Sequence, residues 1–263
     1  MSESESPPEQ SFSERPSPEQ PYVVVTADDS PTLYSPRYQQ TFHSHLGALS
    51  ESRHVFVEAT GLVPRLARGE TVSVLEVGFG TGLNALLTAD ACLEQGGRVE
   101  YWGLEHTLLS ADTLASLGYR DYLARPELYD RLLAWRGTLP TPLPSVLNVD
   151  LAPSVSFRLL IGDATEATLL DHHFRAVYHD AFSPDANPEL WSEAFLNTLY
   201  AALADDGLIA SYSVKGTVRR QMQALGFAVR KRPGPPGGKR EMLLAAKNAE
   251  MLVHPDVPVA VKK

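Results

Sequence analysis

The chain has 263 residues, a formal net charge of −9 at pH 7 and a single cysteine, Cys92. One cysteine excludes a framework of intrachain disulfides and is typical of a reducing, cytoplasmic compartment. The sequence opens without an apolar signal core and contains no run of about 18 apolar residues, which argues against export and against a membrane partner. Its length suits one α/β domain with additional segments.

The first 30 residues differ in composition from the remainder. They are rich in Ser, Glu, Pro and Gln and contain seven acids and one base. Such a segment has too little apolar surface to bury, so residues 1–30 are predicted to form a disordered acidic tail. Because this tail holds six of the nine net negative charges, the overall acidity does not exclude a polyanionic partner. Residues 31–70 are expected to form a cap segment ahead of the first strand.

Residues 72–84, VSVLEVGFGTGLN, carry the strongest functional signal. An apolar run is followed by three glycines at alternate positions and by a helical pattern, which predicts a strand, a tight turn and a helix. Such a turn brings backbone close to a ligand at the N-terminus of a helix. Dinucleotide sites usually have the spacing G-x-G-x-x-G, whereas this turn has G-x-G-x-G and an acid in the preceding strand. An acid suits a cationic ligand such as S-adenosylmethionine, so the candidate cofactor-binding residues here are Glu76, Gly78, Gly80, Gly82 and Asn84.

Alternating strands and helices continue along the chain. Strands are predicted at 99–106, 156–164, 176–184 and 207–214, helices at 188–203 and 217–225, and a terminal antiparallel pair at 227–233 and 240–247. This order predicts an α/β fold with a doubly wound, mostly parallel seven-stranded sheet and an antiparallel terminal strand. The predicted domain covers 71–247, with a Pro- and Leu-rich insertion at 118–150 and a C-terminal tail at 248–263.

Four acids are predicted to lie at one edge of this sheet. Besides Glu76 they are Glu105, Asp163 and Asp180, each at or beside the end of a strand. Ligands of open α/β sheets bind at the carboxyl ends of the strands, so the four side chains are expected to surround one crevice. Glu105 is expected to accept from ribose hydroxyls, Asp163 from an adenine amine, and Glu76 to face the amino-acid end of the cofactor. Asp180 is not needed for the cofactor and is expected to face the acceptor molecule, which a carboxylate suits if it is an amine. It is the candidate catalytic residue.

A basic segment at 211–240 points to a nucleic acid. It contains eight Lys and Arg residues and no acid, which favours a surface that faces phosphates. An RNA base splayed into the crevice would have Tyr34, Phe182 and Trp191 as candidates for stacking. The histidines form no recognisable metal set, so no metal is expected. The candidate phosphate-binding residues are Arg219, Arg220, Lys239 and Arg240.

Several of these segments resemble one family. GFGTGLN, DAFSPDANPELW, VRRQMQALGF and GKREML, together with SESRHVF at 50–56, are similar to the methyltransferase domain of MnmC-type tRNA-modifying enzymes. The resemblance extends over about 35–247 and implies a Rossmann-like, class I methyltransferase fold that binds S-adenosyl-L-methionine. The implied reaction methylates the amine of 5-aminomethyl-2-thiouridine at the wobble position, in the tRNA anticodon loop, giving 5-methylaminomethyl-2-thiouridine. By the same resemblance the cofactor contacts are Gly78, Gly80, Gly82 and Glu105, and the acid that receives the aminomethyl group is Asp180.

Two-domain members of the family also carry an FAD-dependent oxidase, which removes a carboxymethyl group before methylation. This chain has no room for that domain after residue 247, so the resemblance implies a stand-alone methyltransferase without FAD. A separate enzyme is then expected to supply the aminomethyl base. Where the two-domain members have Lys after the acid of the second strand, this chain has His106.

Other interpretations of the same residues remain open. Polyamine synthases have a related fold and an aspartate-rich crevice, and they transfer an aminopropyl group to a diamine without needing a basic segment. A non-catalytic RNA-binding module with a vestigial nucleoside pocket is a second alternative, which binding of S-adenosylmethionine would test. An NAD-dependent oxidoreductase is disfavoured by the glycine spacing.

Overall fold

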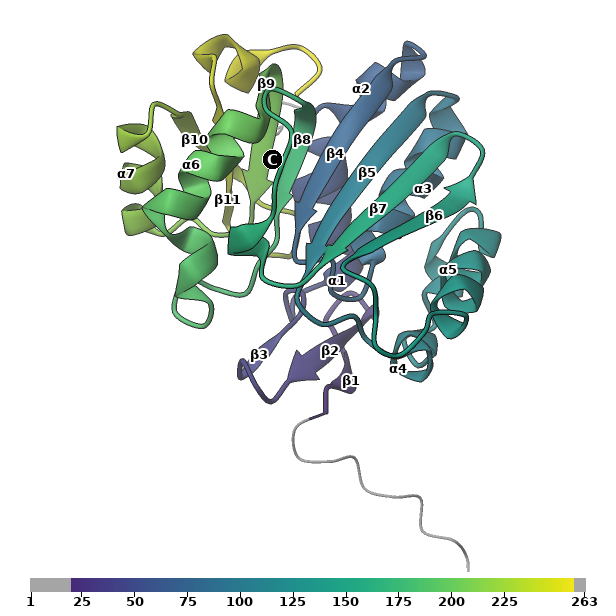
Figure 1. Ribbon diagram of the computed structural model, residues 1–263. Coiled ribbons are helices and arrows are strands. Elements are labelled where there is room, and N and C mark those ends of the chain that lie inside the picture. The colour runs from purple at the N-terminus through teal and green to yellow at the C-terminus, as the bar shows by residue number, and fades with distance from the viewer. Residues whose placement is uncertain (1–19, 258–263) are drawn as a thin grey trace, which may run out of the picture.

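The computed structural model describes residues 20–257, and an eight-stranded sheet forms its centre (Figure 1). In their order across the sheet, the strands are β10 (Ala228–Pro233), β11 (Glu241–Ala246), β9 (Leu203–Ser211), β8 (Phe174–His179), β4 (Thr71–Val77), β5 (Arg98–Glu105), β7 (Val155–Ile161) and β6 (Val146–Ala152). Pairing is parallel from β9 through β8, β4 and β5 to β7, and antiparallel at both ends of the sheet. The predicted α/β fold with a mostly parallel sheet and a terminal antiparallel pair is confirmed.

The predicted seven strands are one too few, because the insertion at 118–150 ends in a strand that the sequence analysis missed. β6 lies at the edge of the sheet and pairs antiparallel with β7. It follows a proline-rich stretch at 140–144, which is typical of a loop. Within β6, Leu147 is buried while its neighbours Val146 and Asn148 are exposed, the pattern of a strand with one face toward solvent.

Helices cover both faces of the sheet (Figure 1). One face carries α2 (Leu62–Ala67), α3 (Leu83–Gln95) and α5 (Glu127–Gly137), and the other carries α6 (Glu193–Ala202) and α7 (Gly216–Ala224). Successive side chains of β4 point to opposite faces, so Val74 joins the apolar core that contains α3, and Leu75 joins the core that contains α6. The same alternation directs Glu76 toward α3. Among the helices of residues 20–257, none combines the length and the apolar character needed to cross a bilayer.

The acids predicted at strand ends lie where the strands meet their turns. Glu105 is the last residue of β5, while Asp163 and Asp180 lie in the turns just beyond β7 and β8. The helix predicted at 188–203 begins later than expected. Its first part is a 3-10 turn, after which Ser192 caps α6 by accepting a hydrogen bond from the backbone N–H at the third helical position.

A small three-stranded sheet and the segments after it form the N-terminal part. It contains β1 (Tyr22–Val25), β2 (Pro31–Ser35) and β3 (Gln40–Thr41), and it lies below the large sheet in Figure 1, beside α1 (Ala48–Glu51). A π-helical segment, Ser52–Glu58, leads from α1 toward α2. The predicted tail boundary at residue 30 is wrong, because the valine-rich β1 pairs antiparallel with β2. Residues 1–19, the rest of that predicted tail, lie outside the described residues.

The predicted C-terminal tail at 248–263 is packed over much of its length. Ala249–Val253 forms a 3-10 turn, and the side chains of Leu252 and Val257 are buried. The turn lies against β10 and β11, and both apolar side chains join the core that contains α3, which explains why the segment does not extend away from the domain. Residues 258–263 lie outside the described residues.

Candidate active site

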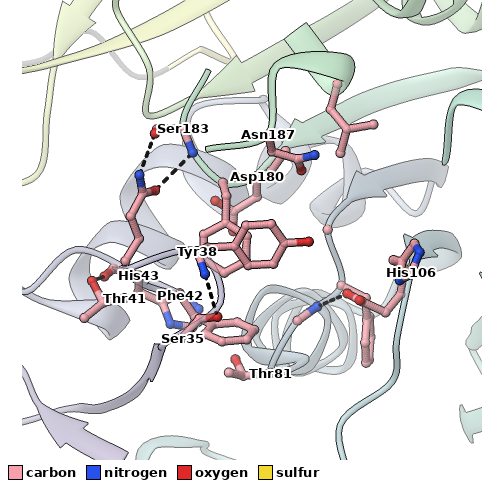
Figure 2. A pocket seen from close by; sticks show the side chains of 18 of the residues that line it. Ser35, Tyr38, Thr41, Phe42, His43, Thr81, His106, Asp180, Ser183 and Asn187 are labelled. Carbon is pink, nitrogen blue, oxygen red and sulfur yellow. Dashed lines mark hydrogen bonds between the residues drawn. The ribbon is translucent and has the colours of Figure 1, made fainter. Parts of the chain in front are cut away.

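A cavity of about 630 Å³ opens at the carboxyl edge of the parallel strands (Figure 2). Its wall comes from the turn after β4, the ends of β5 and β8, the N-terminal sheet and the loop before β11. This edge is where open α/β sheets bind their ligands. Of the candidate site residues, those that line the cavity are Gly78, Gly80, Asn84, Glu105, Asp163, Asp180 and Lys239. Those outside its wall are Glu76 and Gly82, which flank the glycine turn, and Arg219, Arg220 and Arg240.

The glycine turn has the conformation that its sequence predicts. Gly78, Gly80 and Gly82 have φ values of 90°, 50° and 75°, in the left-handed region that favours glycine. A Cβ atom on Gly78 would lie 2.9 Å from the carbonyl oxygen of Asp180, so a side chain there would push the turn away from β8. The N–H of Gly78 donates to the carbonyl of Leu104 at 3.0 Å. The turn therefore fixes the start of α3 against the ends of β5 and β8.

Glu105 holds the glycine turn from the end of β5. Its Oε2 accepts from the Gly80 N–H at 2.8 Å, and its Oε1 accepts from the Thr107 N–H at 2.9 Å. Burial raises the pKa of this carboxyl, and the two backbone donors oppose that rise. Each oxygen accepts only one of these hydrogen bonds, so both keep acceptor capacity for hydroxyl groups in the cavity.

Asn84, in the first turn of α3, connects two carboxylates. Its Nδ2 donates to Glu76 Oε1 and to Asp180 Oδ2, each at 2.8 Å. Burial raises the pKa of Glu76 to about 8. Burial, with the charges of Glu51 and Glu76, also raises the pKa of Asp180 well above its usual range. The Oδ1 of Asn84 is buried and accepts no hydrogen bond from the described residues, so this corner retains an acceptor that suits a cationic group.

Glu51, at the end of α1, is a buried carboxylate that the sequence analysis did not assign to the site. Its Oε1 lies 3.6 Å from the Nζ of Lys239, and that Nζ also lies 4.1 Å from the centroid of the Tyr212 ring. Burial raises the pKa of Glu51, and the nearby Lys239 charge opposes the rise. All three side chains line the cavity with Asp180. The available signal was the segment at 50–56, which resembles a family motif but follows no predicted strand.

Residues of the N-terminal sheet form one wall of the cavity (Figure 2). Tyr38 follows β2 and stacks on Phe182, with the ring centroids 4.2 Å apart. Gln40 donates from Nε2 to Ser183 Oγ at 2.6 Å, and the Ser183 N–H donates to Gln40 Oε1 at 3.2 Å. Of the aromatic residues predicted to stack, Phe182 lines the cavity, whereas Tyr34 and Trp191 do not. A stacked pair of aromatic rings from distant parts of the chain therefore forms part of this wall.

Asp163 lines the cavity but also caps its own turn. Its Oδ1 accepts from the Thr165 N–H at 2.9 Å and from the Thr165 hydroxyl at 2.7 Å, and these bonds lower the pKa of Asp163. They involve Oδ1 alone, so Oδ2 keeps its acceptor capacity. His106 lines the same part of the cavity, with its Nδ1 2.9 Å from Thr107 Oγ1.

The basic segment at 211–240 contains no acid, but acids from other segments lie beside it in the folded structure. Ion pairs join several of its bases to acids from elsewhere in the chain: Lys215 to Asp185 at 2.5 Å, Lys231 to Glu241 at 2.7 Å and Lys239 to Glu51 at 3.6 Å. Lys239 thus contacts a carboxylate of the cavity, which differs from its predicted role on a phosphate-facing surface. Arg219 and Arg220 lie on α7, and Arg240 is exposed just before β11.

Comparisons with known proteins identify the family. Residues 127–248 match a family described as S-adenosyl-L-methionine-dependent methyltransferase. The chain is 36% identical over 230 residues to the tRNA 5-methylaminomethyl-2-thiouridine biosynthesis bifunctional protein MnmC of Aromatoleum aromaticum, covering 86% of this chain and 35% of that protein. The chain belongs to the MnmC-related S-adenosyl-L-methionine-dependent methyltransferases. The protein of the same name from Paraburkholderia phymatum is 33% identical over 253 residues, covering 91% of this chain and 37% of its own.

Solved structures agree with this membership in the MnmC-related methyltransferases. MNMC2 from Aquifex aeolicus matches with a TM-score of 0.71 and 28% identity, over 94% of this chain and 74% of that one. Spermidine synthase from Thermotoga maritima matches with a TM-score of 0.51 and 14% identity, over 90% and 75%, which shows a shared fold alone. The chain spans about a third of the length of the two MnmC proteins named above.

The residues at the glycine turn fit the cofactor that the family implies. The turn brings backbone to the N-terminus of α3, where a Cβ atom on Gly80 would lie only 3.0 Å from the ring of Phe42, so the position requires glycine. Glu105 offers carboxylate acceptors for hydroxyl groups, and the corner formed by Asn84, Glu76 and Asp180 is acidic. A nucleoside that bears a positively charged sulfonium and an ammonium group matches both features.

Proposed function

We propose that this protein transfers a methyl group from S-adenosyl-L-methionine to the amine of 5-aminomethyl-2-thiouridine at the wobble position of tRNA, giving 5-methylaminomethyl-2-thiouridine. The names of its relatives concern biosynthesis of that nucleoside, which supports the choice of substrate. The observation that carries the proposal is the position of Asp180, whose carboxylate lines the same cavity as the glycine turn and is held by Asn84. A carboxylate beside a methyl-donor site suits an acceptor that is an amine.

The proposed cofactor contacts follow from the donor and acceptor groups present. Glu105 accepts from the ribose hydroxyls and Asp163 from the adenine amine, because each keeps acceptor capacity toward the cavity. Asn84 faces the amino-acid end from the cavity wall, and Glu76 acts on that end from behind the wall through its hydrogen bond with Asn84. The glycine turn, including Gly78 and Gly82, brings backbone close to the same end. When bound, the cofactor supplies an electrophilic methyl group on sulfur.

Asp180 has two proposed tasks, which are orientation and proton transfer. An alkylammonium has a pKa of about 10, so the acceptor nitrogen must lose a proton before its lone pair can form a bond to the methyl carbon. Asp180 binds the ammonium, orients it and receives that proton. Burial and the charges of Glu51 and Glu76 raise the pKa of Asp180, which makes it a stronger base than an ordinary aspartate. Orientation alone lowers such a barrier by several kcal/mol.

The tRNA contacts are proposed from charge and from the aromatic wall. An anticodon loop offers unstacked bases, and Tyr38 and Phe182 present rings on which a wobble uridine can stack. Arg219, Arg220 and Arg240 contact flanking phosphates, with an affinity that falls steeply with salt. A separate enzyme supplies the aminomethyl base, and the reaction takes place in the cytoplasm, where tRNA is modified.

The test is incubation with labelled S-adenosyl-L-methionine and tRNA that bears 5-aminomethyl-2-thiouridine, followed by nucleoside mass spectrometry. The wild-type protein should form 5-methylaminomethyl-2-thiouridine, and Asp180→Ala should slow the transfer by about 10²–10⁴-fold. Binding of S-adenosylhomocysteine should remain largely intact in that variant, because Asp180 serves the acceptor.

Asp185→Ala is the matched control, since Asp185 lies in the same loop and forms an exposed ion pair with Lys215. It should keep nearly full activity. Near-normal turnover by Asp180→Ala would remove Asp180 from the mechanism. A parallel reaction with a diamine and decarboxylated S-adenosylmethionine tests aminopropyl transfer, and product there without tRNA methylation would overturn the proposal.

A further inference from the structure

The ammonium group of Lys239 is a positive charge in the wall of the cavity. Its Nζ is 3.6 Å from Glu51 Oε1 and 4.1 Å from the centroid of the Tyr212 ring. A carboxylate beside an aromatic face is an environment that proteins use to bind ammonium groups. The ring itself is fixed, because the Tyr212 hydroxyl donates to the carbonyl of Ala181 at 2.7 Å.

Glu51 and Lys239 differ in how deeply they are buried and in how firmly they are held. The Glu51 side chain is only 5% exposed and accepts at Oε2 from the Ser44 N–H at 2.7 Å, so the carboxylate has a fixed position. The Lys239 side chain is 41% exposed and reaches in from the loop between β10 and β11. A buried carboxylate without a cation is costly, whereas an exposed ammonium can return to water at little cost. The carboxylate is therefore permanent, and its cation is exchangeable.

Asp180 belongs to the same electrostatic group. Glu51 and Asp180 line one cavity, and the charges of Glu51 and Lys239 both act on Asp180, with opposite sign. A ligand that brings its own ammonium to Asp180 therefore enters a field in which Lys239 opposes it and Glu51 favours it. Removing Lys239 from the cavity relieves that opposition.

We propose that Lys239 occupies, in the free enzyme, the site that the ammonium of the substrate takes, and that Glu51 and Tyr212 recognise this ammonium beside Asp180 once Lys239 has swung out. The inference rests on the proposed amine acceptor. Glu51 is then a substrate-binding residue, and Lys239 competes with the substrate ammonium for the same site. The released Lys239 side chain can then contact a phosphate of the bound RNA, which agrees with its prediction as a phosphate-binding residue.

The test compares two anticodon stem-loop RNAs that differ only in the wobble substituent, aminomethyl or hydroxymethyl. The readout is the ratio of their dissociation constants, measured with S-adenosylhomocysteine present, because phosphate contacts affect both RNAs equally and cancel. Lys239→Met should raise the preference for the amine by about tenfold, and Glu51→Gln should lower it by about tenfold. Gln keeps an oxygen for the Ser44 N–H, and unchanged S-adenosylhomocysteine affinity will show that the fold is intact.

Lys231→Met is the matched control, because Lys231 lies on the same hairpin and pairs with Glu241 outside the cavity. The ratio of the two dissociation constants for this variant should equal that of the wild type. Equal weakening of both RNAs by Lys239→Met, with an unchanged ratio, would overturn the inference and make Lys239 a phosphate contact. If the ratios respond as expected but wild-type protein does not methylate the aminomethyl RNA, the proposed function fails and the ammonium site stands.

Discussion

Charged side chains lie at both ends of the parallel strands, but the two ends differ in whether the acids have bases as ion-pair partners. At the amino end a second cavity, of about 610 Å³, nearly equals the first in volume. Its acids are paired with bases: Arg65 with Asp206 at 2.8 Å, His173 with Glu100 at 3.3 Å, and Arg175 with Glu70 at 3.3 Å and with Asp206 at 3.5 Å.

At the carboxyl end the acids are buried and largely uncompensated. Within residues 20–257, Glu51, Glu76 and Asp180 have a single base within ion-pairing distance, Lys239 beside Glu51. Cavity volume therefore does not distinguish the two ends. Buried carboxylates that lack cations do distinguish them, because such groups are retained where a cationic ligand compensates their charge. The next three predictions test this contrast.

The largest effect is expected from Asn84→Asp. The change removes the donor that serves both Glu76 and Asp180 and adds a third carboxylate to the same corner. The free energy of unfolding should fall by about 3–5 kcal/mol in urea denaturation at pH 8. The control is Asn148→Asp on β6, where the residue is exposed and faces Arg158, and the change should stay within about 0.5 kcal/mol. Equal effects of the two substitutions would contradict the contrast.

A smaller effect per pH unit is expected from the pH dependence of Glu76. Its folded pKa, about 8, lies above the ordinary value of 4.5, so between these values the folded state keeps a proton that the unfolded state releases. Glu76 therefore makes the free energy of unfolding fall as pH rises, by at most about 1.4 kcal/mol per pH unit. Glu76→Gln should flatten the profile from pH 5 to 8. A Glu76→Gln profile parallel to wild type would mean that Glu76 is ionised in the fold.

The smallest effect is expected at the amino end. Arg175→Met removes the pairs with Glu70 and Asp206, but these side chains are about a third exposed or more and are well screened. The free energy of unfolding should fall by about 0.5–1 kcal/mol, and methyl transfer to tRNA should be unchanged. The measurement is a urea titration beside the nucleoside assay. A clear loss of transfer would show that the amino end also serves the reaction.

Local patterns were sufficient to predict the central fold. The run at 72–84 predicted β4, the glycine turn and the start of α3, because alternating glycines and an apolar strand determine backbone conformation directly. β6 was missed, since the prolines just before it and its exposed alternate residues resemble a loop, and its pairing with β7 supplies the hydrogen bonds. β1 was missed because the polar composition of the preceding residues dominated the prediction for 1–30.

The site was predicted only in part, for a related reason. Glu105 ends one strand of the parallel sheet and Asp180 follows another, so topology alone brings them to one edge. Glu51 and Tyr38 come from the N-terminal part, and their place in the cavity depends on how that part docks, which no local pattern encodes. Lys239 was predicted to be basic and exposed, but its contact with Glu51 depends on the same docking.

Gln40 and Ser183 are 143 positions apart, yet their two hydrogen bonds close one side of the cavity. Such a contact requires the N-terminal part to dock on the loop after β8, and the entropy of closing the intervening loop must be offset for it to form. A partly folded chain can hold the parallel strands and the glycine turn while the enclosure around them is still unfinished. Ligand affinity therefore reports that the N-terminal part has docked and closed the cavity.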